Sequence, residues 1–283
     1  MKTIDTLIDD VNSLAEEGVD VKHHQTSIDK FSKNMRELIE EFLSSKEKGK
    51  REFRLRMSAL GTPARKLWYQ KNTINELDTF SGSRLIMFFY GHMIEELVLL
   101  LAEVSGHKVE HRQRELKLDG VLGHQDAEID DVLVDVKSAS SYSFDKFKQS
   151  KLYEDDPFGY ITQISAYAQA SNNDDAAFWA VNKQTADMTL MHVDKTYVVD
   201  AVKRIKYLKK ILDSDVPPKR CYEEQFEGKT GNKKLDKNCT FCAYKYECWK
   251  DVNNGEGLRV FKYARGRVYL THIETLPKVE EVL

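Results

Sequence analysis

The chain has 283 residues, of which 41% are hydrophobic and 31% charged, and a formal net charge of −3. This composition is that of a globular protein with a charged surface, and no apolar run is expected to be long enough to cross a bilayer. The N-terminus is acidic and lacks a continuous apolar core, so we expect no signal peptide, a cytoplasmic location and no membrane partner.

A slightly acidic chain that binds nucleic acid has to concentrate positive charge locally. Four clusters of basic residues could do so, at 46–56, 145–151, 203–210 and 229–237. The alternative explanation of each cluster is an ordinary solvated surface.

Residues 1–80 are predicted to be mostly helical, because apolar side chains recur there at helical spacing. A further helix is expected over 81–106, with Ser81 or Ser83 as its N-terminal cap and Gly106 at its end.

The middle of the chain alternates between short β-like runs and helices, one of which has Pro157 at its start. In chain order these elements are expected at 107–118, 121–130, 131–139, 157–171, 176–184, 188–194 and 196–214. This order predicts an α/β core with a mixed sheet.

The chain is thus expected to comprise three regions. A helical N-terminal region (1–80) precedes the α/β core (81–215). The last region (216–283) contains a cysteine-rich segment and a hairpin-like run around Gly266.

The strand predicted at 131–139 carries charge where a buried strand is expected. Side chains alternate between the two faces of a strand, so its valines point toward a core while Asp135 and Lys137 share the other face. Asp126 lies on one face of the preceding strand, and Asp130 and Asp131 have the character of turn residues. If the two strands form a hairpin, Asp126 and Asp135 converge.

Converging carboxylates suit a hard divalent cation such as Mg²⁺ or Mn²⁺, which takes oxygen ligands. Such a metal lowers the pKa of bound water and clamps a phosphate oxygen, and Lys137 could hold the attacking water and offset transition-state charge. The spacing therefore suits phosphodiester hydrolysis. Taken alone, the Asp-x-Lys pattern fits an exposed edge strand with a cross-strand ion pair equally well.

Four short motifs occur in order in this part of the chain. They are the helix GHMIEELV with His92, Glu95 and Glu96, then Gly123-His124-Gln125-Asp126, then Asp135-Val136-Lys137, and finally Gln163 four residues before Tyr167. Together they resemble the PD-(D/E)xK nuclease superfamily, and within it the RecB-like and Cas4-like exonucleases, over roughly residues 85–250.

The resemblance implies a restriction-endonuclease-like core, in which helices flank a mixed central sheet, and a Mg²⁺- or Mn²⁺-dependent deoxyribonuclease. It implies that metal is bound by His92, Asp126, Asp135 and the Val136 carbonyl. It assigns catalysis to Asp126, Asp135, Lys137 and Glu96. It also implies that Gln163 and Tyr167 bind the DNA backbone or support the catalytic lysine.

Each assignment has a plainer alternative. His92 is otherwise a core histidine, and Glu95 is nearly as well placed as Glu96 to join the site. Gln163 and Tyr167, one helical turn apart, are otherwise an ordinary helix surface.

The activity implied is exonucleolytic hydrolysis of DNA, single-stranded or at duplex ends, in replication, recombination or repair in a bacterial or phage-infected cell. The chain carries no ATPase motif, since its GKT lacks the first Walker A glycine, where Glu223 stands. A helicase or recombinase partner would therefore act in trans. The alternatives are a catalytically silent DNA-binding or adaptor module of the same fold, and a site-specific endonuclease.

All four cysteines lie in the last quarter of the chain: Cys221, Cys239, Cys242 and Cys248. In a cytoplasmic chain the C-x2-C spacing favours a metal site over disulfides, and four thiolates can bind zinc or a [4Fe–4S] cluster.

The C-x2-C-x5-C run resembles the iron–sulfur staple of Cas4-like and AddB-like nucleases. In those families the remaining cysteine lies N-terminal to the core, but the corresponding stretch here, residues 59–69, contains none. Cys221 is the expected fourth ligand, which would make the staple local, and zinc is the alternative to the cluster.

Overall fold

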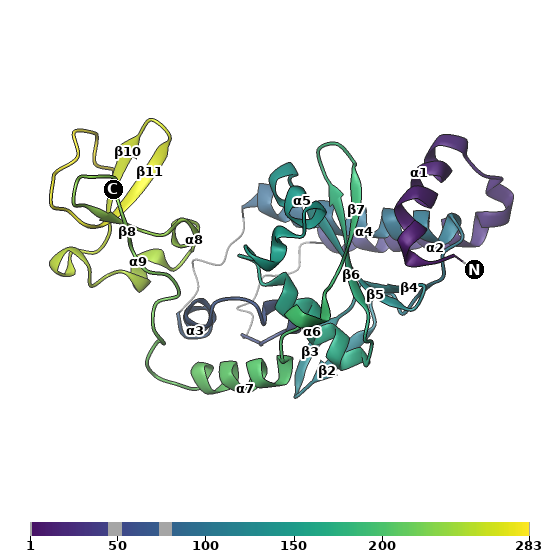
Figure 1. Ribbon diagram of the computed structural model, residues 1–283, viewed down its shortest axis with the longest axis horizontal. Coiled ribbons are helices and arrows are strands. Elements are labelled where there is room, and N and C mark those ends of the chain that lie inside the picture. Colours follow the sequence, from purple (N-terminus) through teal and green to yellow (C-terminus); the bar gives the residue numbers. More distant parts are fainter. Residues whose placement is uncertain (1, 45–52, 74–80, 283) are drawn as a thin grey trace. The chain divides into compact units, whose positions relative to one another are not determined.

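The computed structural model describes residues 2–44, 53–73 and 81–282 (Figure 1). Most of the basic cluster at 46–56 lies outside these residues. The chain forms two compact units: unit 1 contains residues 1–61 and 80–207, and unit 2 contains residues 62–79 and 208–283.

Unit 1 is built on a five-stranded sheet in the order β1-β4-β5-β6-β7. Its strands are β1 (Val109–Glu110), β4 (Ala127–Ile129), β5 (Val132–Ala139), β6 (Ala176–Asn182) and β7 (Met188–His192). β5 and β6 run parallel and the other neighbours antiparallel, which confirms the predicted mixed sheet. A separate antiparallel ribbon is formed by β2 (Glu115–Leu118) and β3 (Val121–His124).

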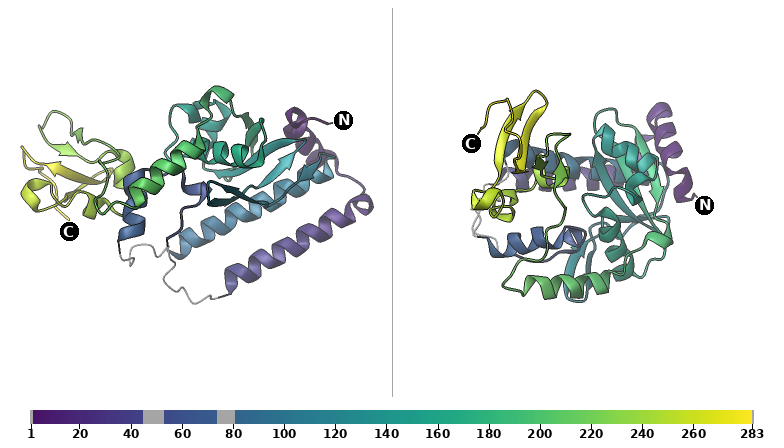
Figure 2. Two further views of the ribbon diagram at one scale, coloured as in Figure 1. Left: turned by 90° about the horizontal axis from the view of Figure 1, so that it is seen from below. Right: turned by 60° about the vertical axis from the view of Figure 1, so that its left-hand side comes forward.

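Helices cover both faces of this sheet (Figure 1). The longer ones in unit 1 are α1 (Leu7–Glu17), α2 (Gln25–Leu43), α4 (Gly82–Val104), α5 (Ser141–Lys148) and α6 (Tyr160–Ser171). Single 3-10 turns lie at Ile4–Thr6, Val21–His24, Met57–Ala59, Lys151–Tyr153, Lys195–Tyr197 and Asn253–Gly255. The predicted helical N-terminal segment is thus present in the described residues, where α2 lies along α4 (Figure 2).

The core of unit 1 lies between the sheet and helices α1 and α4. Val134 and Val136 of β5 pack there with Leu7, Leu99 and Trp179. The valine face of the predicted strand therefore faces the core, as its alternation indicated, and the charged face of β5 is left for the side covered by α5 and α6.

Helix α4 begins after Ser81, whose side chain accepts a hydrogen bond from the Arg84 N–H, and it ends just before Gly106. By length and composition alone it is apolar enough to cross a membrane, which corrects the expectation that no run is long enough. In this fold its C-terminal half supplies Val98 and Leu99 to the core of unit 1.

Two of the predicted strands are each divided. The backbone of His111 and Gln113 has positive φ, which separates β1 from β2, and the turn after β3 separates β3 from β4. The helix predicted from Pro157 starts later, at Tyr160, because the Asp156 carboxylate accepts hydrogen bonds from the first N–H groups at that point.

Unit 2 contains α3 (Ala64–Asn72), α8 (Lys237–Thr240), α9 (Lys245–Cys248) and a small sheet in the order β10-β11-β9-β8. Its strands are β8 (Gln225–Phe226), β9 (Lys233–Lys234), β10 (Arg259–Tyr263) and β11 (Gly266–His272). The pairing of β10 with β11 confirms the predicted C-terminal hairpin. Helix α7 (Ala201–Leu212) runs from unit 1 into unit 2.

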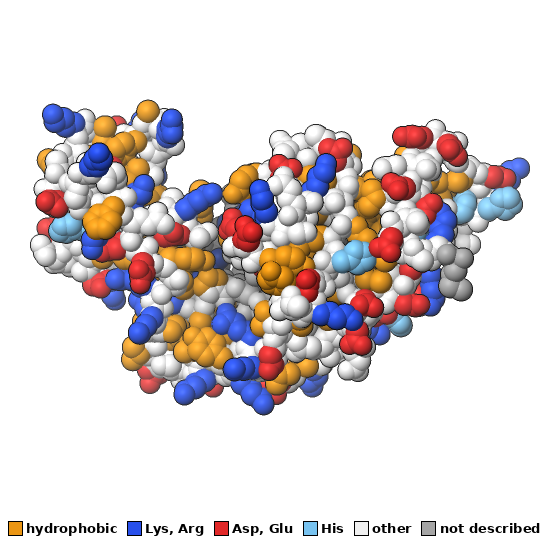
Figure 3. Space-filling model, viewed as in Figure 1, with side chains coloured by type: hydrophobic (Ala, Val, Ile, Leu, Met, Phe, Trp, Pro, Cys, Tyr) orange, Lys and Arg blue, Asp and Glu red, His pale blue; other side chains and the backbone are white. Residues whose placement is uncertain are grey.

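Charge is mixed on the face of the protein shown in Figure 3. Lys and Arg side chains there are interspersed with Asp and Glu and do not form one continuous basic surface. This agrees with the small net charge of −3 and means that any contact with phosphates on this face is local.

Candidate active site

The hairpin of β4 and β5 brings two buried carboxylates opposite one another. Asp130 and Asp131 form its two-residue turn with φ of 50° and 68°, the conformation of the hairpin turns that match strand twist. Ala127 pairs with Val134, so Asp126 and Asp135 face each other at the next position. The Val136 N–H donates to Asp126 Oδ2 at 2.7 Å, which fixes that carboxylate against β5.

Asp135 and Lys137 form a close ion pair on the charged face of β5. Asp135 is 1% exposed, and its Oδ2 lies 2.5 Å from Lys137 Nζ. Gln163 bridges the pair, because its Nε2 donates to Asp135 Oδ1 at 3.3 Å and its Oε1 lies 3.5 Å from Lys137 Nζ. The structure thus brings together the Asp-x-Lys strand and the helix that carries Gln163.

Helix α6 places two tyrosines around this pair. Tyr167 Oη accepts a hydrogen bond from Gln163 Nε2 at 3.2 Å, and the Tyr160 ring centroid lies 4.7 Å from Lys137 Nζ. A Cβ on Gly123 would lie 2.7 Å from Tyr167 Cε1, so the absence of a side chain there lets Tyr167 pack in. Tyr160 was not predicted, because only the helical register places it one turn before Gln163.

Glu95, and not Glu96, is the helix α4 carboxylate that reaches the site. Its Oε1 accepts from Gln113 Nε2 at 2.5 Å, and the Gln113 N–H donates to the Asp126 carbonyl at 3.0 Å. Glu96 is turned elsewhere, toward the guanidinium of Arg112 and the side-chain amide of Asn34 at 3.0 Å. Gln113 was not anticipated, since its role depends on the positive φ of its backbone.

His92 lies at the edge of this group. Its side chain is 61% exposed and its Nδ1 is 3.9 Å from Glu95 Oε2, so it neighbours the site through Glu95. The nearby Glu95 carboxylate raises the pKa of His92, while burial acts against it. His124, which was left outside the expected ligand set, is exposed and lies 3.8 Å from Glu115.

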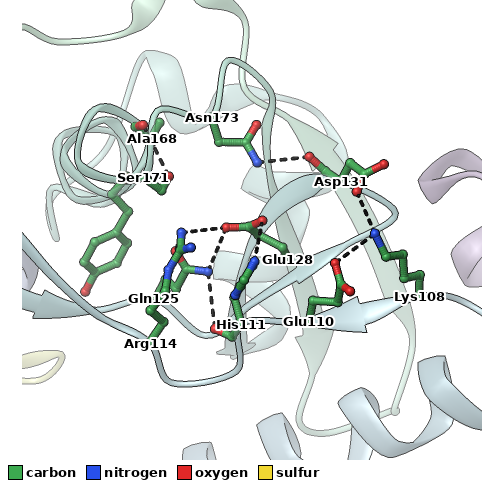
Figure 4. A network of polar contacts seen from close by, with 11 residues as sticks. Lys108, Glu110, His111, Arg114, Gln125, Glu128, Asp131, Ala168, Ser171 and Asn173 are labelled. Atoms are coloured by element: carbon green, nitrogen blue, oxygen red, sulfur yellow. Dashed lines mark hydrogen bonds and ion pairs between the residues drawn. The ribbon is translucent and has the colours of Figure 1, made fainter.

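A buried glutamine fixes the bend from which Asp126 projects (Figure 4). Gln125 is fully buried, and its amide donates to the His111 carbonyl at 3.3 Å and to Glu128 Oε1 at 3.1 Å. Arg114 closes the network by donating to both Gln125 and Glu128. Because the buried Gln125 amide is bonded on both its oxygen and its nitrogen, the network can hold the bend in a low-dielectric environment.

The carboxylates repel one another. Burial raises the pKa of Asp126 well above its usual range, and Asp135 and Glu95 raise it further. Burial also raises the pKa of Asp135, against the opposing effect of Lys137. Burial acts to lower the pKa of Lys137, but Asp135 and Asp126 outweigh it and raise that pKa, so the amine stays protonated. Burial, followed by Asp135, raises the pKa of Tyr167 to about 12.

We expect Asp126→Asn to raise the melting temperature of metal-free protein at pH 8, by an amount on the order of 3 °C. The pKa of Asp126 is higher in the folded state than in the unfolded state. This group therefore contributes stability at pH values below its unfolded pKa, and the contribution is lost as the pH rises through its folded pKa. Neutral asparagine avoids that loss and can still accept from the Val136 N–H. Thermal melts in chelator from pH 4 to 8 should show the gain shrinking toward acid.

Asp131→Asn is the matched control, because this carboxylate is in the same hairpin with its side chain 86% exposed. It should show no gain that grows with pH. A lower melting temperature for Asp126→Asn than for wild type at pH 8 would contradict the inference that the buried charge of Asp126 destabilises the metal-free protein.

Among the described residues, no three His, Cys, Asp or Glu side chains are already arranged around a metal position. The side chains of Asp126, Asp135 and Glu95 each contact other protein groups instead. Asp135 Oδ2 nevertheless has no hydrogen-bond donor in good geometry, although Lys137 forms an ion pair with it.

The four thiols lie in unit 2 and are not arranged as a formed metal cage either. Burial, followed by Cys248 and Cys242, raises the pKa of Cys239 to about 12. Cys239 packs in the small core of this unit with Leu235 and Trp249. The predicted cysteine staple is therefore not formed here.

No family model and no curated protein matches this sequence. Among solved structures, it is similar to a phage-related exonuclease from Haemophilus somnus 129PT, with 16% identity and a TM-score of 0.41 over 56% of this chain and 93% of that one. It is also similar to the alkaline exonuclease LHK-Exo from Laribacter hongkongensis, with 11% identity and a TM-score of 0.37 over 56% and 88%. The complex of LHK-Exo with dAMP gives 12% identity and a TM-score of 0.33 over 56% and 92%.

Proposed function

We propose that this protein is a metal-dependent nuclease that hydrolyses phosphodiester bonds in DNA. The observation that carries the proposal is the charged face of β5. There, Asp126, Asp135 and Glu95 share one buried region with a protonated lysine, Lys137. Neither packing nor a cross-strand ion pair explains three carboxylates in one place, since one lysine cannot balance them.

The donor set fits a hard divalent cation, Mg²⁺ or Mn²⁺. Asp126 and Asp135 would hold it, joined by the Val136 carbonyl, which leaves β5 on the same side as the N–H that binds Asp126. Glu95 would take the catalytic role that the resemblance assigned to Glu96. His92, which neighbours Glu95, would act beside it. When bound, such a metal lowers the pKa of a water and withdraws charge from a phosphate oxygen.

Lys137 would act as a fixed cation and hydrogen-bond donor. Its amine stays protonated, so it is suited to orienting a water and offsetting negative charge on the phosphate, and unsuited to removing a proton. Gln163 would hold the lysine and Asp135 in register through its two hydrogen bonds. Tyr167 would keep Gln163 in that orientation, and either side chain could meet the DNA backbone.

Within this function we propose exonucleolytic action on single-stranded DNA or duplex ends, in DNA replication, recombination or repair. The proposal rests on the order and spacing of the four motifs, and a helicase or recombinase would act as a separate partner.

We propose further that the four cysteines hold a [4Fe–4S] cluster, with zinc as the alternative. Support comes from the C-x2-C-x5-C spacing. A cationic donor also reaches one sulfur, since Arg65 Nε lies 3.1 Å from Cys248 Sγ.

Digestion of end-labelled linear DNA, with and without Mg²⁺ or Mn²⁺, tests the nuclease proposal. We expect metal-dependent release of label from single-stranded or duplex ends and no cleavage of covalently closed circles. Cleavage of circles at defined positions would establish the endonuclease instead. Binding of DNA without cleavage under any metal condition would leave a silent adaptor and overturn the enzyme.

A further inference from the structure

Helix α3 is attached both to the end of α7 and to the cysteine segment 221–248, although well over a hundred residues separate it from them in the sequence. Trp68 Nε1 donates to the Ser214 carbonyl at 2.7 Å, and Lys71 Nζ donates to the Leu212 carbonyl at 2.7 Å. The Tyr69 ring stacks on the buried ring of Tyr244, with centroids 5.8 Å apart. These contacts hold the body of the helix, and its first turn is held separately.

Arg65 makes the contacts of that first turn. Its Nε donates to Cys248 Sγ at 3.1 Å, one terminal nitrogen donates to the Pro218 carbonyl, and the other lies 3.3 Å from Tyr69 Oη. The planar guanidinium has five donors in fixed directions, so one side chain can join three separate segments. A lysine has a single charged centre and could not reproduce this pattern.

Cys248 is in turn held by further contacts of its own backbone. Its N–H donates to the Tyr244 carbonyl at 2.8 Å, and its own carbonyl accepts from Arg220 at 3.2 Å. Arg220 also lies over the Trp249 ring, with its Cζ 4.0 Å from the centroid. With Arg65 on its sulfur, Cys248 is fixed at its nitrogen, its oxygen and its side chain.

A second contact joins the same turn of α3 to another cysteine. The backbone N–H groups of Lys66 and Arg65 are hydrogen-bond donors to the Cys221 sulfur. The start of α3 therefore meets two of the four thiols, one through backbone donors and one through the Arg65 side chain.

We infer that Arg65 is a positioning residue of the cysteine site, which attaches α3 to the cysteine segment through the sulfur of Cys248. The site is then built from α3 as well as from the cysteine segment 221–248, two stretches of unit 2 that are distant in the sequence. This differs from the expected local staple, in which the segment 221–248 would be closed on itself. The attachment needs no metal, and only its effect on metal retention rests on the thiolate site proposed above.

A double-mutant cycle with hydrogen exchange tests the attachment. Arg65→Ala and Cys248→Ala should each speed amide exchange in residues 64–72 about tenfold, and the two together should give much less than the product of the single effects. Lys71→Ala, which removes an α3 contact away from the cysteines, is the control and should combine multiplicatively with Cys248→Ala. Multiplicative effects of Arg65→Ala and Cys248→Ala, or unchanged exchange in Arg65→Ala, would overturn the inference.

Metal retention provides the second readout. Bound iron or zinc, measured against time in chelator, should be lost several-fold faster from Arg65→Ala and Arg65→Lys than from wild type, and at the wild-type rate from Lys71→Ala. Equal loss from all four proteins would limit Arg65 to holding α3 and overturn its role at the cysteines. Wild-type protein that contains neither metal would refute the cluster proposal, while the exchange cycle would still decide the attachment.

Discussion

Lys137→Ala is expected to lower the rate of DNA cleavage by at least about 10²–10³-fold, the loss typical when one preorganised donor is removed from an active site. The physical reason is that Lys137 forms an ion pair with Asp135 at 2.5 Å, and its protonated state is maintained by Asp135 and Asp126. Single-turnover cleavage of labelled DNA at saturating Mn²⁺ would measure the loss in the chemical step. Excess metal should not rescue it, because the lysine is not a ligand.

The variant also leaves Asp135 buried without its cationic partner, so loss of folding has to be separated from loss of chemistry. Lys137→Met keeps the apolar part of the side chain, and its circular dichroism and DNA binding should match wild type. Lys108→Ala is the matched control, since this exposed lysine forms ion pairs with Glu110 and Asp131 in the same sheet. Cleavage near the wild-type rate in folded Lys137→Met would remove Lys137 from the mechanism.

The parts of the site that follow from local rules were predictable from sequence. Strand alternation put the valines of β5 in the core and Asp135 with Lys137 on the other face. The tendency of aspartate to adopt positive φ identified the turn at Asp130 and Asp131, and this turn fixes the register that sets Asp126 against Asp135.

The choice between Glu95 and Glu96 was beyond any local rule. Both lie within one helical turn of His92, so helical spacing treats them almost alike. What separates them is the Arg112 guanidinium, which takes Glu96, and the Gln113 amide, which takes Glu95. Both partners come from the loop between β1 and β2, where the backbone of Gln113 has positive φ.

The attachment of α3 to the cysteine segment could likewise not be predicted from the sequence. A search of the sequence for a fourth thiol examines cysteine spacing, and the stretch at 59–69 contains no cysteine. The structure fills that place with an arginine, whose bond to sulfur has no sequence pattern of its own. Long-range contacts of this kind depend on the tertiary fold.

The second large effect is expected from Gly61→Ala, which should destabilise unit 1 by about 2–4 kcal/mol. A Cβ at Gly61 would lie 2.2 Å from Gly159 Cα and 2.3 Å from the Gly159 carbonyl oxygen. Both of these are backbone atoms, so the clash cannot be relieved by turning a side chain. Gly61 does not have positive φ, so the effect reports the contact itself and not a strained conformation of the new alanine.

The clash should also reach the active site, because Gly159 is the residue that precedes α6. It has a φ of 75°, and its carbonyl accepts a helical hydrogen bond from the Gln163 N–H at 3.0 Å. Pushing Gly159 away from Gly61 displaces the start of the helix that positions Gln163 and Tyr167. Cleavage by the folded fraction should therefore fall as well as stability, with Lys137 chemically intact.

Denaturant unfolding of Gly61→Ala and Gly82→Ala checks this prediction with a matched pair. A Cβ on Gly82 meets nothing within 4 Å, and this residue opens helix α4, so alanine there should leave stability unchanged or raise it by a few tenths of a kcal/mol. The same chemical change is thus expected to have opposite consequences at two glycines of one unit. Equal midpoints for the two variants would show that the backbones at 61 and 159 are not in contact, and that α6 is held in register by the Asp156 cap alone.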